Sequence, residues 1–342
     1  MFRVYASMDQ RLPLGAVAGH ARRAEALGYD ALAVPEAVHD GLLCAGAALA
    51  ATQRLAVATS VLVAFPRSPM VVAIAAWDLQ EASDGRFELG LGSQVRGNIE
   101  GRYATPWTAP VPRMREYVGA LRAIFDCWQR GAPLAFEGEH YRFTRMQPFF
   151  TPEPLDTAPI PILLGGVGPG MLALTGEVAD GLVTHPTSSA PRSLREDVRP
   201  RLATGASRAD RSPADVSVSA NPLIATGPTE DDARRERERA RTLLTFLFST
   251  PPYWRTLDLF GWRPIGERLH ELSRAGRWNE MPGAVHDEML DALVPTAAYD
   301  RIADVLREWY GELAEAVSFP VPEDATWDPG ARRVIAELQE GR

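Results

Sequence analysis

The sequence predicts a (β/α)₈ barrel, and three observations support this fold class. Short apolar runs alternate with longer amphipathic stretches through most of the chain, as in repeated βα units around a parallel sheet. A length of 342 residues suits one closed barrel with insertions. Hydrophobic residues make up 46% and charged residues 23%, which is typical of a globular protein with a sizeable core. We therefore expect one domain over residues 1–342, with insertions near 131–158 and 249–291.

The expected strands are short apolar runs, each followed by a stretch that returns the chain to the other end of the barrel. In chain order they are Phe2–Met8, Ala31–Glu36, Leu55–Val63, Phe87–Gln94, Pro161–Gly166, Gly181–Pro186, Val216–Ala225 and Ala316–Phe319. The expected helices between them include Leu14–Leu27, Pro69–Ser83, Val111–Gln129, Ala297–Leu313 and Pro329–Gln339. Gly28 follows the first helix as a favourable C′ residue, and the turn dipeptide Asp84-Gly85 follows the second.

Two segments interrupt the barrel pattern. Phe136–Phe143 contains Glu137-Gly138 and is expected to form a small hairpin. Ser249–Asp291 contains Pro251-Pro252 and several aromatic residues, which predicts a long excursion over one barrel end that could roof a pocket. The charge run Glu230–Arg241 mixes both signs and is expected to be a solvated helix face.

Charge and composition exclude several classes of mechanism. The 36 basic residues are all arginine, so a lysine Schiff base, a lysine nucleophile and a P-loop lysine are impossible. A net charge of −8 disfavours non-specific nucleic-acid binding. Cys44 and Cys127 lie in expected helices, so neither a disulfide framework nor a metal site is expected. The absence of a long apolar stretch and of a secretory leader predicts a cytoplasmic protein without membrane contact.

The functional residues of such a barrel follow its strands, and the second strand carries a candidate pair there. Glu36 ends this strand, and His39 and Asp40 come directly after it. A carboxylate and an imidazole at one rim could act as an acid/base pair. In the alternative interpretation, Glu36 hydrogen-bonds the barrel and His39 lies in a solvated loop.

A glycine-rich run follows the fifth strand and opens a helix. It reads Gly165-Gly166-Val167-Gly168-Pro169-Gly170-Met171. Backbone N–H groups at a helix N-terminus can bind an anion, and glycine lets a phosphate approach closely. The alternative is a plain turn without a ligand.

Several ordered blocks resemble one family over nearly the whole chain. They are "TSVLVAFPRSP", "AAWDLQEASDGRFELGLGSQVRG" and "PILLGGVGPGM", with "STPPYWRTLDLFGW" and "DEMLDALVP" in the irregular region. Together they look like the coenzyme F420-dependent branch of the luciferase-like monooxygenase superfamily. The resemblance implies a luciferase-like barrel that holds a flavin or deazaflavin at the C-terminal ends of its strands.

The resemblance also implies roles for particular residues. Ser60-Val61 would carry a non-prolyl cis peptide, forming a bulge against which the tricyclic ring leans; the alternative is an ordinary trans bulge. Gly92 and Ser93 would line the ring or its ribityl chain, and the glycine run 165–171 would receive the phosphate. The place of His185 after the sixth strand, at a junction rich in hydroxyl groups, separately indicates contact with the cofactor phosphate or the substrate. The alternative is a helix-capping role for Ser188 or Ser189.

Coenzyme F420 is strongly anionic, with a phosphodiester and a glutamate tail, so arginines should counter its charge. The expected residues lie just beyond the third and fourth strands: Arg67, Arg96, Arg102 and Arg113. The chain departs from the sugar-phosphate dehydrogenases of this branch, which have a glutamate where Val95 stands and use lysines for the substrate phosphate. Among their catalytic residues, His39 is the persuasive match.

We therefore expect an F420-dependent oxidoreductase that transfers a hydride between a deazaflavin and a small organic substrate. His39 would handle the accompanying proton, aided by Glu36. One alternative is an FMN-dependent luciferase-like monooxygenase, because the same barrel can hold either ring. Another is a non-catalytic flavin-binding protein, because a fold alone does not establish turnover. A homodimer is a further expectation that the sequence leaves open.

Overall fold

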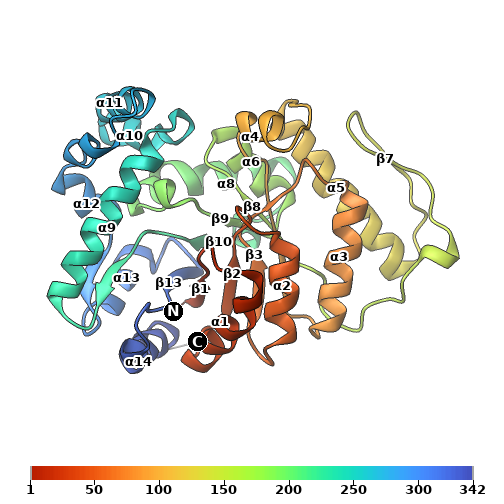
Figure 1. Cartoon of the computed structure of the whole chain (residues 1–342). Helices are drawn as coiled ribbons and strands as arrows, with labels where there is room; N and C mark the ends of the chain where they lie inside the picture. Colours follow the sequence, from red (N-terminus) through yellow and green to blue (C-terminus); the bar gives the residue numbers. More distant parts are fainter. Residues whose placement is uncertain (1, 341–342) are drawn as a thin grey trace.

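The computed structural model describes residues 2–340, which build a closed barrel of parallel strands inside a ring of helices (Figure 1). The barrel strands are β1 (Arg3–Ser7), β2 (Ala31–Val34), β3 (Ala56–Thr59), β5 (Phe87–Gly92), β8 (Ile162–Gly165), β9 (Gly181–Val183), β10 (Ser217–Ala220) and β13 (Ala316–Pro320). Neighbours pair in the order β3-β2-β1-β13-β10-β9-β8-β5, and a β3–β5 pairing closes the ring. A short strand, β4 (Leu62–Val63), extends the third position and also pairs with β5. The predicted (β/α)₈ barrel is confirmed.

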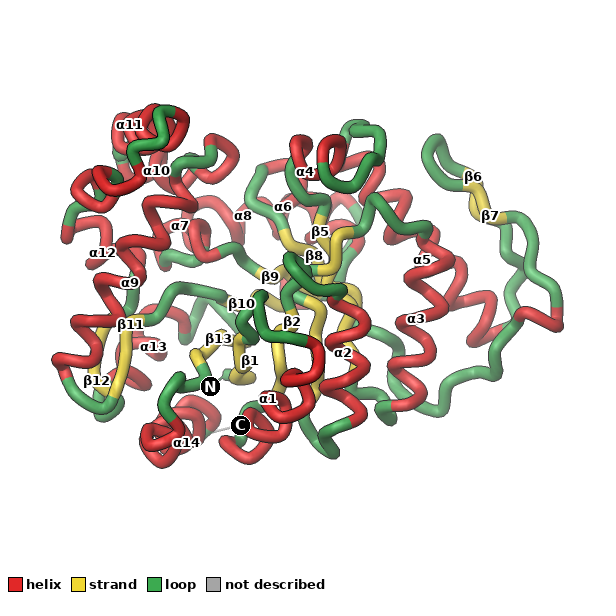
Figure 2. Tube along the Cα trace, viewed as in Figure 1, coloured by secondary structure: helices red, strands yellow, loops and turns green. Residues whose placement is uncertain are grey.

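The main outer helices follow the strands and surround them, as Figure 2 shows. They are α1 (Leu14–Leu27), α2 (Gly41–Ala50), α3 (Pro69–Ala82), α5 (Pro110–Arg130), α6 (Pro169–Val178), α8 (Arg199–Arg208), α13 (Ile302–Tyr310) and α14 (Asp328–Gln339). A short helix, α4 (Arg96–Gly101), follows β5. Helix α1 ends at Gly28, whose φ of 94° is in the left-handed region that glycine adopts without strain.

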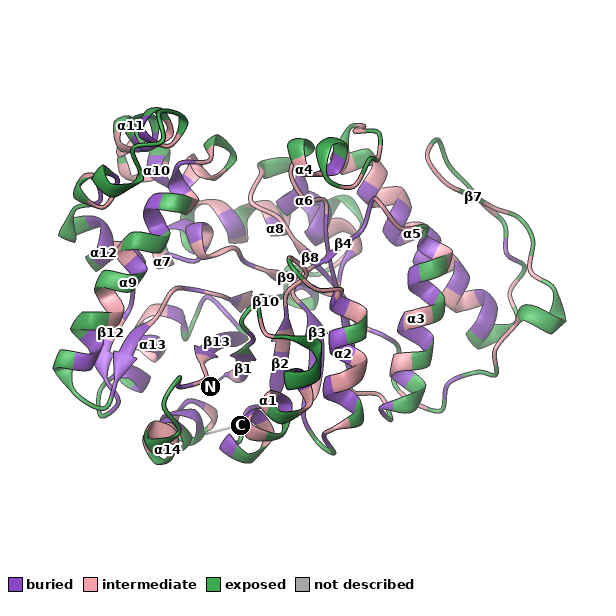
Figure 3. Cartoon of the chain, viewed as in Figure 1, coloured by how far each residue is buried: buried purple, intermediate pink, exposed green. Residues whose placement is uncertain are grey.

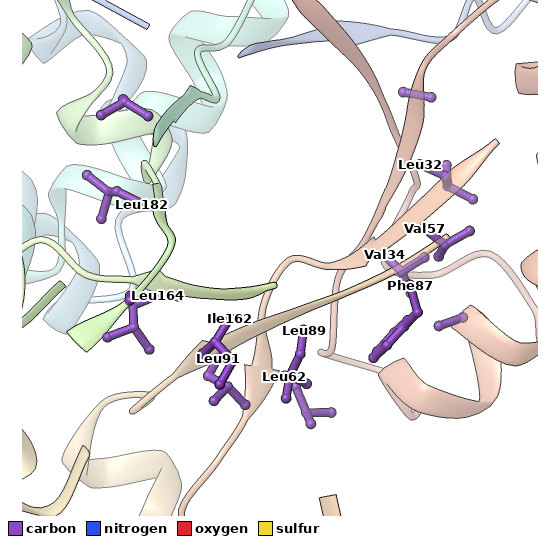
Figure 4. Close-up of a cluster of buried hydrophobic side chains, with 14 of the residues drawn as sticks. Leu32, Val34, Val57, Leu62, Phe87, Leu89, Leu91, Ile162, Leu164 and Leu182 are labelled. Carbon is purple, nitrogen blue, oxygen red and sulfur yellow. The ribbon is translucent and has the colours of Figure 1, made fainter. Parts of the chain in front are cut away.

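The apolar core fills the space around the strands. Figure 3 shows buried residues along the strands and on the barrel-facing sides of the helices, and Figure 4 shows ten of the core side chains: Leu32, Val34, Val57, Leu62, Phe87, Leu89, Leu91, Ile162, Leu164 and Leu182. At the N-terminal end of the barrel, Glu88 accepts a hydrogen bond from the Tyr5 hydroxyl (2.7 Å) and forms an ion pair with Arg3 (2.7 Å). That polar cluster lines a 130 Å³ cavity at the N-terminal end of the strands.

Two of the expected elements are wrong in their extent. The expected strand Val216–Ala225 is divided, because Asn221-Pro222 follows β10 and proline cannot donate to a strand ladder. The chain then forms β11 (Ala225–Gly227), which pairs with β12 (Thr296–Ala298) outside the barrel. The start of the expected helix Ala297–Leu313 therefore belongs to a strand, and α13 begins only at Ile302.

Two excursions leave the barrel. The first is the predicted hairpin, in which β6 (Phe136–Glu137) pairs antiparallel with β7 (Arg142–Phe143). Glu116 of α5 holds its tip by accepting three backbone N–H groups. The second is a helical lobe on α9 (Glu230–Phe248), built from α10 (Arg255–Phe260), α11 (Arg263–Arg274) and α12 (Asp287–Leu293), with its own apolar core.

The described helices include none that is both long and apolar enough to cross a bilayer.

Candidate active site

The strand ends place the predicted site residues around one barrel mouth. Ser60 and Val61 follow β3, Gly92 ends β5, Gly165 ends β8, and His185 comes two residues after β9. His39 belongs to the loop after β2. Because β2 and β9 are four positions apart in either direction around the eight-strand ring, His39 and His185 come from opposite sides of the mouth.

The third strand is interrupted at the predicted bulge. The peptide bond between Ser60 and Val61 is cis, as the resemblance implied. A Cβ built on Gly92 would lie 2.5 Å from a methyl group of Val61, and one on Gly165 would lie 3.1 Å from the other. These two glycines therefore accommodate the Val61 side chain between β5 and β8.

A third glycine, Gly90, allows β5 to pack closely against the end of β3, just before the bulge. Gly90 lies so close to β3 that a Cβ there would be 1.9 Å from the carbonyl oxygen of Thr59. The Thr59 hydroxyl donates to the Gly90 carbonyl (2.8 Å) and accepts from the Gly90 N–H (2.9 Å). The position of the bulge is thus set by contacts with β5 as well as by the local sequence.

Small side chains line the centre of the mouth. A narrow cavity there is lined by Ala33, Ala58, Ser60, Val183, Ser219, Asn221 and Ser318, with Tyr5 below them. Large residues at these positions would fill the barrel end. Its volume is only about 10 Å³, room for about one water molecule. These small side chains therefore close the centre of the barrel, and a flat ring cannot enter between them.

An ion-pair network organises the two loops beside His39. Arg67, four residues after β4, pairs with Glu36 (2.5 Å) and with Asp40 (2.7 Å). Glu36 also accepts the backbone N–H of Val63 (2.6 Å), and its side chain is almost fully buried. Asp40 accepts the N–H groups of Leu42 and Leu43 and so caps α2. Burial would raise the pKa of Asp40, but the hydrogen bonds from Leu43 and Arg67 lower it.

His39 lies between these two anchored carboxylates. Its side chain is half-buried, and no described residue within 2–340 makes a hydrogen bond with its imidazole. Glu36 is different, because both of its carboxylate oxygens accept hydrogen bonds from Arg67 and one also accepts from Val63. Of the two residues predicted here, His39 has the side chain with free hydrogen-bonding groups, and Glu36 fixes the loop that carries it.

The glycine-rich run after β8 forms the start of α6. Gly168 is the N-cap residue and offers no side-chain acceptor, and Pro169 at the first helical position has no N–H. The uncapped N–H groups are therefore those of Gly170 and Met171. A Cβ on Gly168 would meet no atom within 4 Å, so the space before the helix is open. A Cβ on Gly166 would instead lie 2.4 Å from Met171, which is buried. Gly166 and Met171 therefore pack on each other, while Gly168 faces the open side.

His185 is held tightly on the opposite rim. Its Nδ1 contacts the Thr187 hydroxyl (2.7 Å) and accepts the Thr187 N–H (3.3 Å), so the proton of the neutral ring is on Nε2. Its ring stacks on Tyr253 with centroids 4.3 Å apart. Burial lowers the pKa of His185 to about 4, and the ring is therefore neutral at pH 7. It can donate one hydrogen bond to a ligand but carries no charge.

The arginines expected to face a cofactor tail have protein partners instead. Arg67 is in the network described above, and Arg96 pairs with Glu100 on α4 (2.9 Å). Arg102 donates to the carbonyl of Ala37, and Arg113 donates to the Tyr141 hydroxyl (2.9 Å) and to two carbonyls. These contacts join loops to one another. They could not be predicted from the fact that the arginines follow strands β4 and β5.

Sequence reasoning missed a cavity beside the mouth. It has a volume of 330 Å³ and lies between the start of α6, the loop after β9 and the helical lobe. Its polar lining includes Thr187, Ser188, Ser193, Asp197, Arg201 and Arg255. Arg255 comes from the irregular segment that was expected to roof a pocket, but no local motif marks its partner Asp197.

Comparison with known proteins identifies the family. The luciferase-like monooxygenase family matches residues 1–315. An uncharacterised protein of Mycobacterium tuberculosis is 41% identical over 303 residues, which cover 88% of each chain. A putative coenzyme F420-dependent oxidoreductase of the same organism is 28% identical over 281 residues, covering 75% of this chain and 76% of the relative.

A solved structure gives the same fold. The coenzyme F420-dependent tetrahydromethanopterin reductase of Methanopyrus kandleri superposes with a TM-score of 0.80 at 18% identity and covers 98% of both chains. The protein is thus an oxidoreductase built on a (β/α)₈ barrel with its candidate site at the C-terminal rim. It belongs to the luciferase-like monooxygenase family.

Proposed function

We propose that the protein is an F420-dependent oxidoreductase that transfers a hydride between a deazaflavin and a small organic substrate. One observation carries the proposal: the Val61 side chain, held between Gly92 and Gly165, stands at a mouth of small side chains next to an uncapped helix start. This arrangement suits a flat ring with an anionic chain. The relative that is named as a putative F420-dependent oxidoreductase supports the choice of cofactor.

Each part of the rim would have a separate task. Val61 and the neighbouring small residues would support the ring, and Ser93 would lie beside its ribityl chain. The open N–H groups at the start of α6, next to Gly168, would receive the phosphate. The neutral His185 would donate a hydrogen bond from Nε2 to the same chain. When bound, the deazaflavin supplies the hydride chemistry.

His39 would exchange the proton that accompanies the hydride. Its imidazole has no hydrogen-bond partner among residues 2–340, and it comes from the side of the mouth opposite His185, where substrate can meet the ring. Glu36 and Asp40 position it, since both are tied to Arg67 on the neighbouring loop. Glu36 is therefore a positioning residue in this proposal, and His39 is the catalytic one.

Binding measurements test the choice of cofactor. Purified protein should bind coenzyme F420 more tightly than flavin mononucleotide in calorimetric titrations at the same salt concentration. Equal or reversed affinities would contradict the proposal. Turnover then distinguishes an enzyme from a flavin-binding protein, because the latter would bind the cofactor without catalysing any exchange with substrate.

The second candidate is an FMN-dependent monooxygenase, which the family description favours. The two candidates differ in how the bound reduced cofactor reacts with oxygen. A monooxygenase would consume oxygen with its reduced cofactor in the presence of substrate, whereas the proposed hydride-transfer enzyme would not. Stopped-flow oxidation of the reduced complexes in aerated buffer separates them.

A further inference from the structure

The cavity beside the mouth has two arginines on its wall that share one carboxylate. Arg201 of α8 donates from Nε to Asp197 (2.6 Å), and Arg255 at the start of α10 donates to both oxygens of the same carboxylate. Asp197 lies in a short π-helix, Leu194–Val198 (η3), just before α8. Burial would raise the pKa of Asp197, but the hydrogen bonds from Arg255 and Arg201 lower it, so the carboxylate is ionised.

This sharing leaves donors without a partner. Both terminal nitrogens of Arg201 and one of Arg255 have no acceptor among the described residues. About a third or more of each arginine side chain is exposed, at 35% and 39%. Of the hydroxyl groups on the wall, that of Ser188 already donates to the carbonyl of His185 (3.1 Å), and those of Ser193 and Thr256 share one hydrogen bond (3.3 Å), which leaves one of these two free to donate. The cavity therefore offers several hydrogen-bond donors to an anion.

The charge balance of the cavity favours the same kind of ligand. The other two carboxylates on its wall already have arginine partners, since Glu196 pairs with Arg192 and Asp258 pairs with Arg263. Asp197 neutralises one of the two arginines that it contacts. One positive charge remains beside an open volume of 330 Å³, at the start of a helix whose first N–H groups are uncapped.

We propose that Arg201 and Arg255 form a subsite for a carboxylate on the anionic tail of the cofactor. The inference rests on the proposed deazaflavin site and extends it to a part of the ligand that the mouth does not hold. Val167 belongs both to the wall of this cavity and to the loop that starts α6, so a chain whose phosphate binds at α6 can continue into the cavity. His39 is on the far side of the ring of strands, which leaves the substrate side free.

The arrangement also connects the helical lobe to the barrel. Arg255 comes from the lobe, and Arg201 and Asp197 come from the helices that follow β9. A carboxylate bound by both arginines would contact the two parts at once. The tail would then add affinity without touching the reacting ring.

Variants of the three residues test the subsite against two ligands. The ligands are coenzyme F420 with its glutamate tail and the tail-less 8-hydroxy-5-deazaflavin core, each titrated by fluorescence into the full chain. In the triple variant Arg201→Gln/Asp197→Asn/Arg255→Gln, both arginines are removed without leaving the Asp197 carboxylate unpaired. Arg268→Gln on α11 is the matched control, since it also lowers the net charge by one and lies outside the cavity lining.

The ratio of the two dissociation constants is the readout. We expect the triple variant to bind coenzyme F420 about 10- to 100-fold more weakly, the usual loss for charge-assisted hydrogen bonds, with the affinity for the core unchanged. The control should keep the wild-type ratio. An unchanged ratio in the triple variant, or an equal loss for both ligands, would overturn the subsite while leaving the deazaflavin site intact. A wild-type protein that binds neither ligand would overturn the proposed function as well.

Discussion

The two histidines at the mouth differ in what surrounds their rings. His185 is half-buried, stacked on Tyr253 and bonded to Thr187, whereas the imidazole of His39 has no hydrogen-bond partner among residues 2–340. A ring that is held neutral down to acidic pH is a poor proton carrier at pH 7. In the proposed function, His39 would therefore exchange the proton, and His185 would act as a fixed hydrogen-bond donor.

Replacing His39 should separate chemistry from binding. His39→Ala is expected to lower turnover by about 10²- to 10⁴-fold, the usual range for general acid–base catalysis, with little change in cofactor affinity. Steady-state kinetics with a substrate identified by screening, together with a cofactor titration, measures both quantities. His140→Ala, on the hairpin far from the mouth, is the control. Near-wild-type turnover of His39→Ala at every pH would remove this role from His39.

The lowered pKa of His185 makes stability depend on pH. The folded ring has a pKa of about 4 against 6.5 for an unperturbed histidine, so between these values the unfolded chain binds more protons. Stability is therefore lost as the pH falls from 6.5 towards 4, by roughly 2 kcal/mol at pH 5 from this residue. Urea unfolding at pH 7 and pH 5 should show a smaller loss for His185→Gln than for wild type. An identical loss in both proteins, or the same reduction in the exposed-site control His286→Gln, would contradict this.

At the residue scale, the sequence predicts where a side chain lies in the fold better than it predicts which residues that side chain contacts. The strand ends correctly indicated where Glu36, His39 and His185 would lie, because a parallel barrel brings all such ends to one rim. Nothing local shows that Glu36 pairs with Arg67, which is 31 positions further along the chain. The bonds of a charged side chain depend on which loops meet in space, so the ion pairs around Arg67 and Asp197 had to come from the structure.

At the scale of elements, the start of α6 combines two kinds of glycine. Gly166 is needed for packing, because any side chain there would collide with Met171. Gly166→Val, which the sequence alone would suggest as a probe of anion binding, is therefore expected to disturb the loop itself. Gly168 has open space in front of it and lies at the N-cap, so it is the position at which binding can be probed without damage to packing.

Gly168→Asp should change stability and affinity in opposite directions. Aspartate is a favoured N-cap residue and its charge suits a helix N-terminus, so the variant should unfold at an equal or slightly higher denaturant concentration. The same carboxylate would occupy the anion position and repel a phosphate, which should weaken cofactor binding by at least about tenfold. Paired unfolding and titration curves measure the two effects. Undiminished affinity would show that the phosphate binds elsewhere.

Some helix and strand boundaries are set by nearby residues, and others by pairing with distant parts of the chain. Helices α1 and α14 could be bounded from their own residues, since a capping glycine or a proline marks an end. Strand β12 could not be predicted, because its residues read as part of a helix until they pair with β11, about seventy residues earlier. Pairing across the chain decided the structure there, against the local pattern.

At the scale of the whole molecule, the exposed apolar side chains are unevenly distributed. Among residues 2–340, ten large hydrophobic residues are exposed. Six of them belong to one neighbourhood formed by the loop before α2, helices α2 and α3, and the end of the hairpin excursion: Val38, Leu43, Val71, Ile74, Phe149 and Phe150. Phe149 is 90% exposed, and it lines a 300 Å³ cavity against Ile74 of α3. We call this surface the α2–α3 face; Figure 1 shows α2 and α3 side by side, with the hairpin excursion beyond α5.

We propose that a second copy of the chain covers the α2–α3 face. Helix α2 carries no charged residue, and the first nine residues of α3 carry none, so the face has little to attract a charged partner. Contiguous exposed apolar surface of this kind marks protein interfaces, and most homodimers pair one patch with itself around a two-fold axis. The protruding Phe149 and the cavity beside it lie on the same face, so two copies could each insert the aromatic side chain into the other.

The mass in solution tests this pairing. Light scattering after gel filtration should give twice the chain mass at micromolar concentration. Val71→Asp/Ile74→Asp places two charges at the centre of the face, and because each would be buried without a partner, the dimer dissociation constant should rise by at least about 100-fold. Leu243→Asp on α9, another exposed apolar position, is the control and should leave the mass unchanged. A wild-type protein that stays monomeric at 100-fold higher concentration would exclude a second copy from this face.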